Sequence, residues 1–205
     1  MKNNFLLLLL MFVALNFLNA QINISVGNTI TQNFTIGTST TATMPTNWKV
    51  DKNTSVRTVG SYSSALSTTE RISGNNMSSS APNGIYNFAA GVENSATDRA
   101  VGGLSSSSAS KSVNIYCYLN NNGAQTIEKF KISYDVEKYR NGSNAEGFTI
   151  QMYYSTNGTS WTSAGNDFKT SFPADENNNG YTTAPGSTVS VTDKMLNITL
   201  SQNQK

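Results

Sequence analysis

The sequence predicts an all-β, antiparallel sandwich of two packed sheets. From Ile30 onward, apolar residues alternate with polar ones, and no window of about 11 residues carries a helical stripe. The 205 residues include 27 Asn, 27 Ser and 24 Thr. Such small polar side chains suit exposed strand faces and turns and do not suit long helices. We therefore expect paired strands joined by polar loops.

Composition excludes several classes of function. The chain has no histidine, which rules out a histidine base or histidine metal ligand. Cys117 is the only cysteine, which excludes an internal disulfide and a cysteine-built zinc site. Its alternating segment predicts a buried, inert thiol, with a reactive or intermolecular thiol as the alternative. A formal charge of +2 is too weak to indicate nucleic-acid binding.

The first 20 residues predict an export signal. Lys2 precedes an apolar run from Phe5 to Phe17, and Ala20 supplies a small residue at the cleavage position. The run is shorter than the roughly 20 residues of a spanning helix, so a membrane anchor is the weaker alternative. We expect a secreted or cell-surface protein with no transmembrane segment after signal cleavage. Its parts are a signal peptide at 1–20, an N-terminal lead-in at 21–29 and a single β-sandwich domain at 30–205.

Two segments, 126–139 and 148–155, predict strands most clearly. Their inward residues are Phe130, Ile132, Tyr134 and Val136 in the first and Phe148, Ile150, Met152 and Tyr154 in the second. Asn157-Gly158 follows, a pair typical of a tight type I′ hairpin turn, and Trp161 is expected to pack this hairpin against the core. A weaker pair of strands is expected at 188–191 and 196–200.

Polar connections separate the strands, the longest at 60–84 and 104–110. Apolar residues resume directly after each, so we interpret both as surface loops of one sandwich rather than as interdomain linkers. Only residues 201–205 follow the last predicted strand. Because an open sheet edge invites aggregation, either this strand closes the sandwich or the chain continues beyond Lys205.

Several segments taken together resemble a known module. They are Met44-Pro45-Thr46-Asn47-Trp48, Gly84-Ile85-Tyr86-Asn87-Phe88, and the runs at 98–104, 132–140 and 151–156. The set resembles the jelly-roll β-sandwich module near the front of large bacterial exoproteins, many of which carry a C-terminal secretion-sorting tail. The resemblance covers roughly residues 30–200. It implies a lectin-like or carbohydrate-binding-module-like sandwich, truncated at its C-terminal end and followed by further domains in a longer chain. The family has no settled activity.

Tyrosines on the predicted outer faces suggest a ligand platform. Tyr116, Tyr118, Tyr139 and Tyr153 alternate with inward residues, and Gln151 and Asp135 lie on the same faces. Exposed aromatic surface costs free energy unless something covers it, and flat rings can stack on sugar rings. The alternative is that loops or a neighbouring domain cover these rings.

Asp175, Asn177 and Asn179 precede Gly180 in the pattern D-x-N-x-N-G, the opening half of a calcium loop. The twelfth position is Gly186 instead of the bidentate Glu of an EF-hand. A structural calcium ion is therefore one interpretation, and an ordinary Asn-rich turn is the other. No other cofactor is implied.

Asp135 and Glu137 share a strand face about 7 Å apart, as do the acid and base of some sandwich glycosidases. Nearby lysines and arginines offer the alternative of cross-strand ion pairs. Arg99 stands at a strand entrance, where arginine more often fixes a loop than binds a substrate.

These features predict a secreted, non-catalytic binding or adhesion module whose partner is a glycan or cell-surface polymer. The alternative is an N-terminal accessory fragment of a larger secreted hydrolase or surface protein. A glycosidase that uses Asp135 and Glu137 is a distant third hypothesis.

Overall fold

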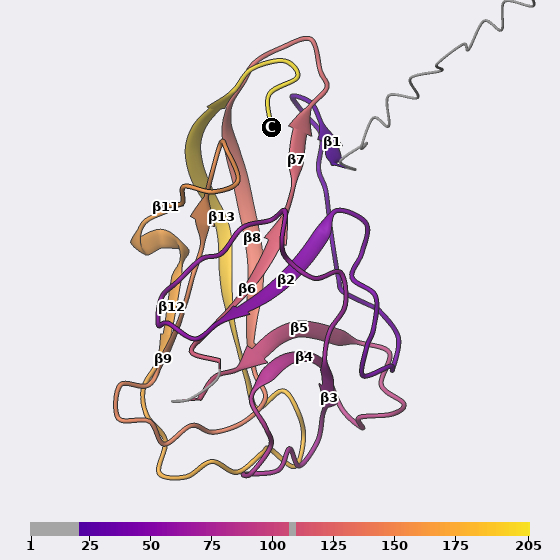
Figure 1. Ribbon diagram of the computed structural model, residues 1–205, viewed down its shortest axis with the longest axis vertical. Helices are drawn as coiled ribbons and strands as arrows, with labels where there is room; N and C mark the ends of the chain where they lie inside the picture. Colours follow the sequence, from indigo (N-terminus) through magenta and orange to yellow (C-terminus); the bar gives the residue numbers. More distant parts are fainter. Residues whose placement is uncertain (1–20, 107–109) are drawn as a thin grey trace, which may run out of the picture.

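The computed structural model describes residues 21–106 and 110–205; the predicted signal peptide lies outside them. The described residues form an all-β structure without an α-helix, built from several small sheets (Figure 1). This arrangement is consistent with the predicted β-sandwich. One 3₁₀ turn, η1 (Asn166–Phe168), interrupts the strands. In residues 21–106 and 110–205, no helix is long and apolar enough to cross a membrane.

In the described part of the chain, the strands pair in six sheets. The pairs are β1 (Ile22–Ile24) with β7 (Leu119–Asn121), β2 (Trp48–Asn53) with β6 (Ser112–Cys117), β8 (Ile127–Lys138) with β13 (Ser187–Leu200), β9 (Phe148–Gln151) with β12 (Lys169–Phe172), and β10 (Tyr153–Tyr154) with β11 (Thr162–Ser163). The sixth sheet has the order β3 (Arg71–Ser73), β4 (Gly84–Ala89) and β5 (Arg99–Leu104).

Two pairings are parallel, β1 with β7 and β3 with β4, which corrects the prediction of a purely antiparallel arrangement. Each of these strands reaches its partner through a long connection instead of a tight turn, and only such a connection allows a parallel approach. Alternation of polar and apolar residues identifies a strand, but it does not show whether that strand pairs with its partner in the parallel or the antiparallel direction.

The long antiparallel pair of β8 and β13 runs along the molecule, with β1 and β7 beside one end and β3–β5 near the other (Figure 1). Its apolar face meets Phe168 and the β10–β11 region, as the alternation in 126–139 predicts. The two late strands expected at 188–191 and 196–200 are one strand, β13. The register shifts between Val191 and Lys194, where Asp193 adopts a positive φ of 52°.

The predicted strand at 148–155 divides at Met152 into β9 and β10. Its inward face is only partly covered, since Phe148 and Ile150 are exposed while Met152 and Tyr154 pack against Phe168. The predicted two-residue turn at Asn157-Gly158 is wrong. Tyr154 pairs with Thr162, so the connection is longer, and the Asn157 side chain accepts hydrogen bonds from the backbone N–H groups of 159 and 160.

The segment expected as a lead-in, 21–29, contains strand β1 and is part of the packed structure. Ile24 is buried with Ile127 and Leu200, far away in the sequence. The alternation that marks the other strands needs more than three residues to be visible, so sequence reasoning missed this strand.

Candidate ligand-binding surface

Two of the four tyrosines predicted to form the ligand platform, Tyr116 and Tyr139, are buried. Tyr116 is 3% exposed and Tyr139 is 4% exposed, so the prediction that these rings face outward is wrong. Tyr118 and Tyr153 are half-buried, as is Gln151, and Asp135 is exposed. The predicted platform therefore does not exist as one surface, and each residue has its own surroundings.

Tyr116 lies on the face of the β2–β6 pair that the loop after β2 covers. Its phenol donates a hydrogen bond to Asp51 at 2.7 Å and accepts one from the Gly60 N–H at 2.8 Å. The Trp161 ring packs on it, with ring centroids 5.4 Å apart. Burial, followed by the hydrogen bond to Asp51, raises the pKa of Tyr116 far above its usual value of 10.0. This ring supports the loop and is closed to a ligand.

Tyr139 belongs to the core beside β4. Its ring stacks on Phe88 with centroids 4.5 Å apart, next to Tyr86 and Met77. The phenol donates to a Glu137 carboxylate oxygen at 2.6 Å. Burial and that carboxylate raise the pKa of Tyr139 well above 10.0.

The remaining predicted residues lie on strands other than β6, which carries Tyr116. The Gln151 side-chain amide donates to the carbonyl oxygens of Met152 and Gly165, both at 3.0 Å. Asp135 accepts a hydrogen bond from Ser190 across the β8–β13 pair at 2.6 Å. Tyr153 lies on β10 opposite Ser163. The polar groups of Gln151 and Asp135 are thus engaged within the protein.

A different group of rings does reach the surface together. Tyr62, from the loop between β2 and β3, lies 4.8 Å from Tyr118 between ring centroids, and both are half-buried. Tyr62 and Trp161 both contact the buried Tyr116 ring, at 6.5 and 5.4 Å. The Lys49 ammonium lies 4.8 Å from the centroid of Tyr62. We call Tyr62, Tyr118, Trp161 and Lys49 the aromatic surface.

Sequence reasoning found Tyr118 and predicted that Trp161 packs its hairpin, and it missed Tyr62 and Lys49. Tyr62 stands in a serine-rich loop, Gly60-Ser61-Tyr62-Ser63-Ser64. A single aromatic residue in such a polar loop was the feature of the sequence that could have indicated a functional role for Tyr62. Only the folded loop shows that this ring returns to the β2–β6 face.

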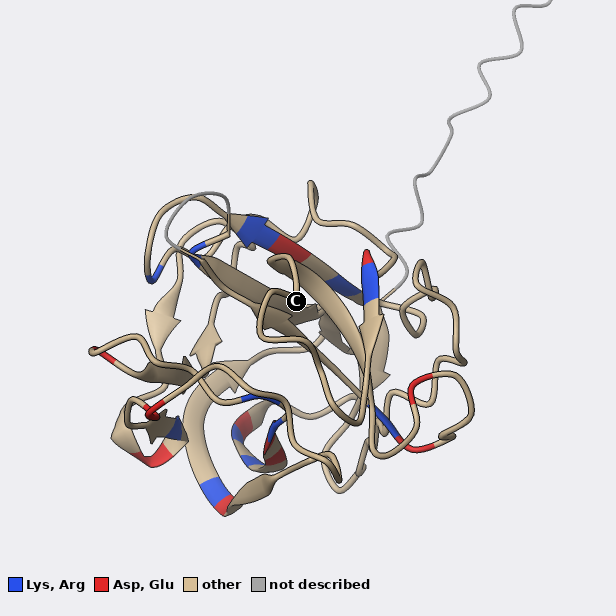
Figure 2. Cartoon of the chain, turned by 90° about the horizontal axis from the view of Figure 1, so that it is seen from below, with Lys and Arg blue, Asp and Glu red and all other residues tan. Residues whose placement is uncertain are grey.

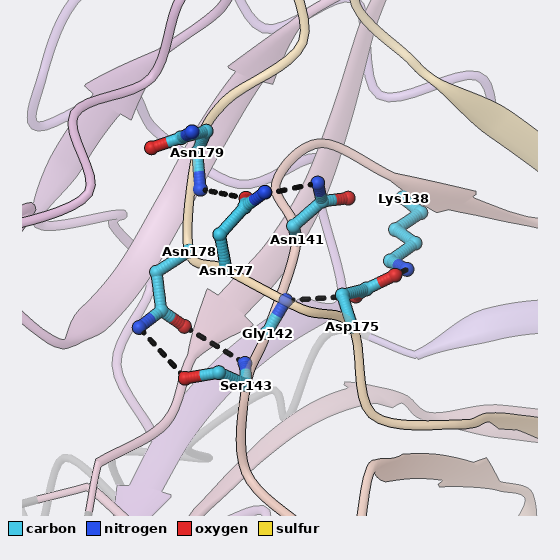
Figure 3. A network of polar contacts seen from close by, with 8 residues as sticks. All are labelled: Lys138, Asn141, Gly142, Ser143, Asp175, Asn177, Asn178 and Asn179. Atoms are coloured by element: carbon cyan, nitrogen blue, oxygen red, sulfur yellow. Dashed lines mark hydrogen bonds and ion pairs between the residues drawn. The ribbon is translucent and has the colours of Figure 1, made fainter.

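The predicted calcium residues form a hydrogen-bonded turn (Figure 3). Asp175 accepts from the Lys138 ammonium at 2.7 Å and from the Gly142 N–H at 2.8 Å. The Asn177 oxygen accepts from the Asn179 N–H at 2.8 Å, and the Asn179 side chain points away from that of Asp175. In residues 21–106 and 110–205, no group of three or more acidic or cysteine side chains could hold a metal. This geometry favours the Asn-rich turn over calcium.

Lys138 is the buried partner in that turn. Its side chain is 7% exposed and that of Asp175 is 24% exposed. The ammonium also lies 5.6 and 5.9 Å from the ring centroids of Phe172 and Phe148. The hydrogen bond from Lys138 lowers the pKa of Asp175 below 3.8. Although burial opposes it, the Asp175 carboxylate raises the pKa of Lys138 above 10.5.

The glycosidase hypothesis requires Asp135 and Glu137 to be available to a substrate. Instead, Asp135 accepts from Ser190, and Glu137 accepts from the buried Tyr139. Arg99 is 3% exposed and donates to Asn87 and to the carbonyl oxygens of Glu93 and Ala96. It fixes the loop before β5, as its position at a strand entrance predicts.

A hollow of about 310 Å³ lies on the β3–β4 side of the molecule. Oppositely charged Arg71 and Glu93 line it, together with Tyr86. Figure 2 shows the same mixing of basic and acidic residues over the whole chain, with short blue and red segments spread among the elements. Neither the hollow nor the described part of the chain as a whole has a surface on which charges of one sign predominate.

Cys117 is exposed, which corrects the prediction of a buried thiol. The protein atoms around it nevertheless desolvate the thiolate and raise the pKa of the thiol to about 11. Because the thiolate is disfavoured, Cys117 is a weak nucleophile at neutral pH.

Comparisons with family models, with curated proteins and with solved structures find no match to this chain.

Proposed function

We propose that this protein is a secreted, non-catalytic carbohydrate-binding or adhesion module that binds glycans through the aromatic surface. The observation that carries the proposal is the pair of half-buried rings, Tyr62 and Tyr118, 4.8 Å apart on a fixed support. Aromatic side chains that gather in one exposed patch indicate a binding site, whereas single exposed side chains do not. Sugar rings offer flat C–H faces that stack on such rings.

The support beneath these rings favours binding because it is rigid. Tyr116 is anchored by Asp51 and Gly60, and the Trp161 indole donates to the Gly60 carbonyl oxygen at 2.8 Å. Pre-ordered rings lose little conformational entropy when a ligand stacks on them. Hydroxyls of Ser61 and Ser63, 2.9 Å apart on the same loop as Tyr62, offer hydrogen bonds to sugar hydroxyls.

We also propose that the sandwich has a jelly-roll topology and belongs to the exoprotein module that it resembles in sequence. The jelly-roll topology, the lectin-like character and the place near the front of a longer exoprotein are supported by the sequence motifs alone. In the alternative function, the chain is the accessory module of a larger secreted hydrolase or surface protein. Glycan binding by the aromatic surface serves both, because an accessory module brings its enzyme to a polymer. The engaged carboxylates of Asp135 and Glu137 do not favour the glycosidase hypothesis.

A polysaccharide pull-down tests the proposal. The mature chain is mixed with insoluble cellulose, xylan, chitin and α-glucan and with immobilised acidic polysaccharides, and the retained fraction is measured. We expect retention on at least one polymer, with an affinity reduced about two- to ten-fold in Tyr118→Ala and Tyr62→Ala, since stacking on one ring contributes about 0.5–1.5 kcal/mol.

Tyr153→Ala is the matched control, because Tyr153 is a half-buried tyrosine on another sheet. It is expected to bind like the wild type, and circular dichroism checks that each variant is folded. Retention on none of the polymers contradicts the proposal, and so does equal retention of Tyr118→Ala and the wild type.

A further inference from the structure

Lys49 is the cation of the aromatic surface. It lies on β2, next to Tyr116 across the β2–β6 pair, and its ammonium lies over the Tyr62 ring at 4.8 Å. Its one hydrogen bond among the described residues is long, 3.4 Å to the Ser63 carbonyl oxygen. An ammonium has three N–H donors, so this cation retains donors for a ligand.

Among the described residues, no carboxylate forms an ion pair with Lys49. The ion pairs within residues 21–106 and 110–205 join other lysines, with Lys52 on Glu70 and Lys138 on Asp175 as the shortest. Asp51 lies on the same face of β2 as Lys49. Its carboxylate accepts hydrogen bonds from the Tyr116 hydroxyl at 2.7 Å and from the Asn114 amide at 2.6 Å. The surface therefore presents an ammonium without an ion-pair partner beside two rings.

We infer that the ligand of the aromatic surface is an acidic polysaccharide, whose sugar stacks on Tyr62 and Tyr118 while its carboxylate accepts hydrogen bonds from Lys49. This inference rests on the proposed function and names the class of glycan. A ring next to a cation is complementary to a sugar that carries an anion, because stacking positions the sugar and the charge selects it. A neutral glycan offers hydroxyl oxygens to the ammonium but no opposite charge.

The experiment compares polymers that differ only in charge. Polygalacturonate, alginate and hyaluronan are each immobilised beside the same polymer with its carboxylates esterified. Binding of the mature chain is measured at about 20 and 150 mM salt, since a charge contact at a surface weakens with ionic strength. We expect at least one acidic polymer to bind about ten-fold tighter than its ester.

The Lys49 variants test the residue. Lys49→Gln should bind the acidic polymer about ten-fold less tightly and lose the preference over the ester, while Lys49→Arg should retain most of that preference. Lys129→Gln removes one positive charge from the exposed side of β8 and is the matched control, expected to behave like the wild type.

Each outcome has a separate meaning. Equal binding to acidic and esterified polymers, or binding to neutral polymers alone, overturns the acidic ligand and leaves glycan binding intact. A preference that persists unchanged in Lys49→Gln overturns the role of Lys49. Binding to none of the acidic or neutral polymers overturns the inference together with the proposed function.

Discussion

The Trp161 indole N–H donates to the Gly60 carbonyl oxygen at 2.8 Å and thereby joins two loops 101 residues apart in the sequence. One loop links β10 to β11 and the other follows β2. Their junction covers Tyr116, and it positions Tyr62 at the edge of the covered region. The aromatic surface therefore depends on a contact between loops, beside strand β2, which carries Lys49, and Tyr118, which directly follows β6.

Trp161→Phe should loosen this junction while retaining an aromatic ring on Tyr116. The variant loses one hydrogen bond to a backbone carbonyl, which contributes about 0.5–1.5 kcal/mol to the free energy of unfolding. Urea denaturation measures the loss, and amide hydrogen exchange should become faster in residues 58–62. Exchange that stays at the wild-type rate in this loop would show that the indole N–H does not fix it.

Tyr116→Phe should destabilise the protein by about 1–3 kcal/mol, because it leaves the Asp51 carboxylate and the Gly60 N–H without their shared partner. The measurement is the midpoint of urea unfolding. Tyr154→Phe is a suitable control, since no described hydrogen bond uses its hydroxyl. Wild-type stability in Tyr116→Phe would mean that water replaces the lost hydroxyl.

The Lys138–Asp175 ion pair should make stability depend on pH at both extremes. The folded pKa of Asp175 is lowered, so its contribution is present above the unfolded value of about 3.9 and is lost as pH falls through the folded pKa. The folded pKa of Lys138 is raised, so its contribution is present below about 10.4 and is lost as pH rises through the folded pKa. The pair therefore contributes fully between about pH 5 and 9.

Asp175→Ala should accordingly lose about 2–3 kcal/mol at pH 7, because it leaves a buried ammonium unpaired, and the difference from wild type should shrink as pH falls below about 4. Asp167→Ala removes the acid of an exposed pair, Lys194 with Asp167, and should stay within about 0.5 kcal/mol of wild type. Thermal melting across pH 2–10 compares them. A constant difference at all pH values would argue against the ion pair as its cause.

Calcium should leave thermal stability unchanged. The Asp175 oxygens already accept hydrogen bonds from Lys138 and Gly142, so a cation would have to displace the ammonium. The melting temperature is expected to be the same with EGTA and with millimolar CaCl₂. A rise on adding calcium that disappears in Asp175→Ala would restore the calcium interpretation of this loop.

Sequence alone predicted β8 within one residue at each end, because residues 129–137, most of this strand, alternate between polar and apolar side chains. It also predicted that Arg99 fixes a loop, since a guanidinium at a strand entrance finds backbone carbonyl oxygens. The prediction failed at Tyr116. Alternation separates the two faces of β6 correctly, yet Ile115 on the apolar face is exposed while Tyr116 on the other face is buried.

The amino-acid sequence thus determined that the chain forms paired strands, because side-chain alternation and turn residues act locally along the chain. It did not determine which faces are covered, in which direction short strands pair, or which rings meet at the surface. Those properties depend on where loops such as the one that carries Tyr62 come to rest. Contacts between distant residues decide that position, and a local pattern contains no information about them.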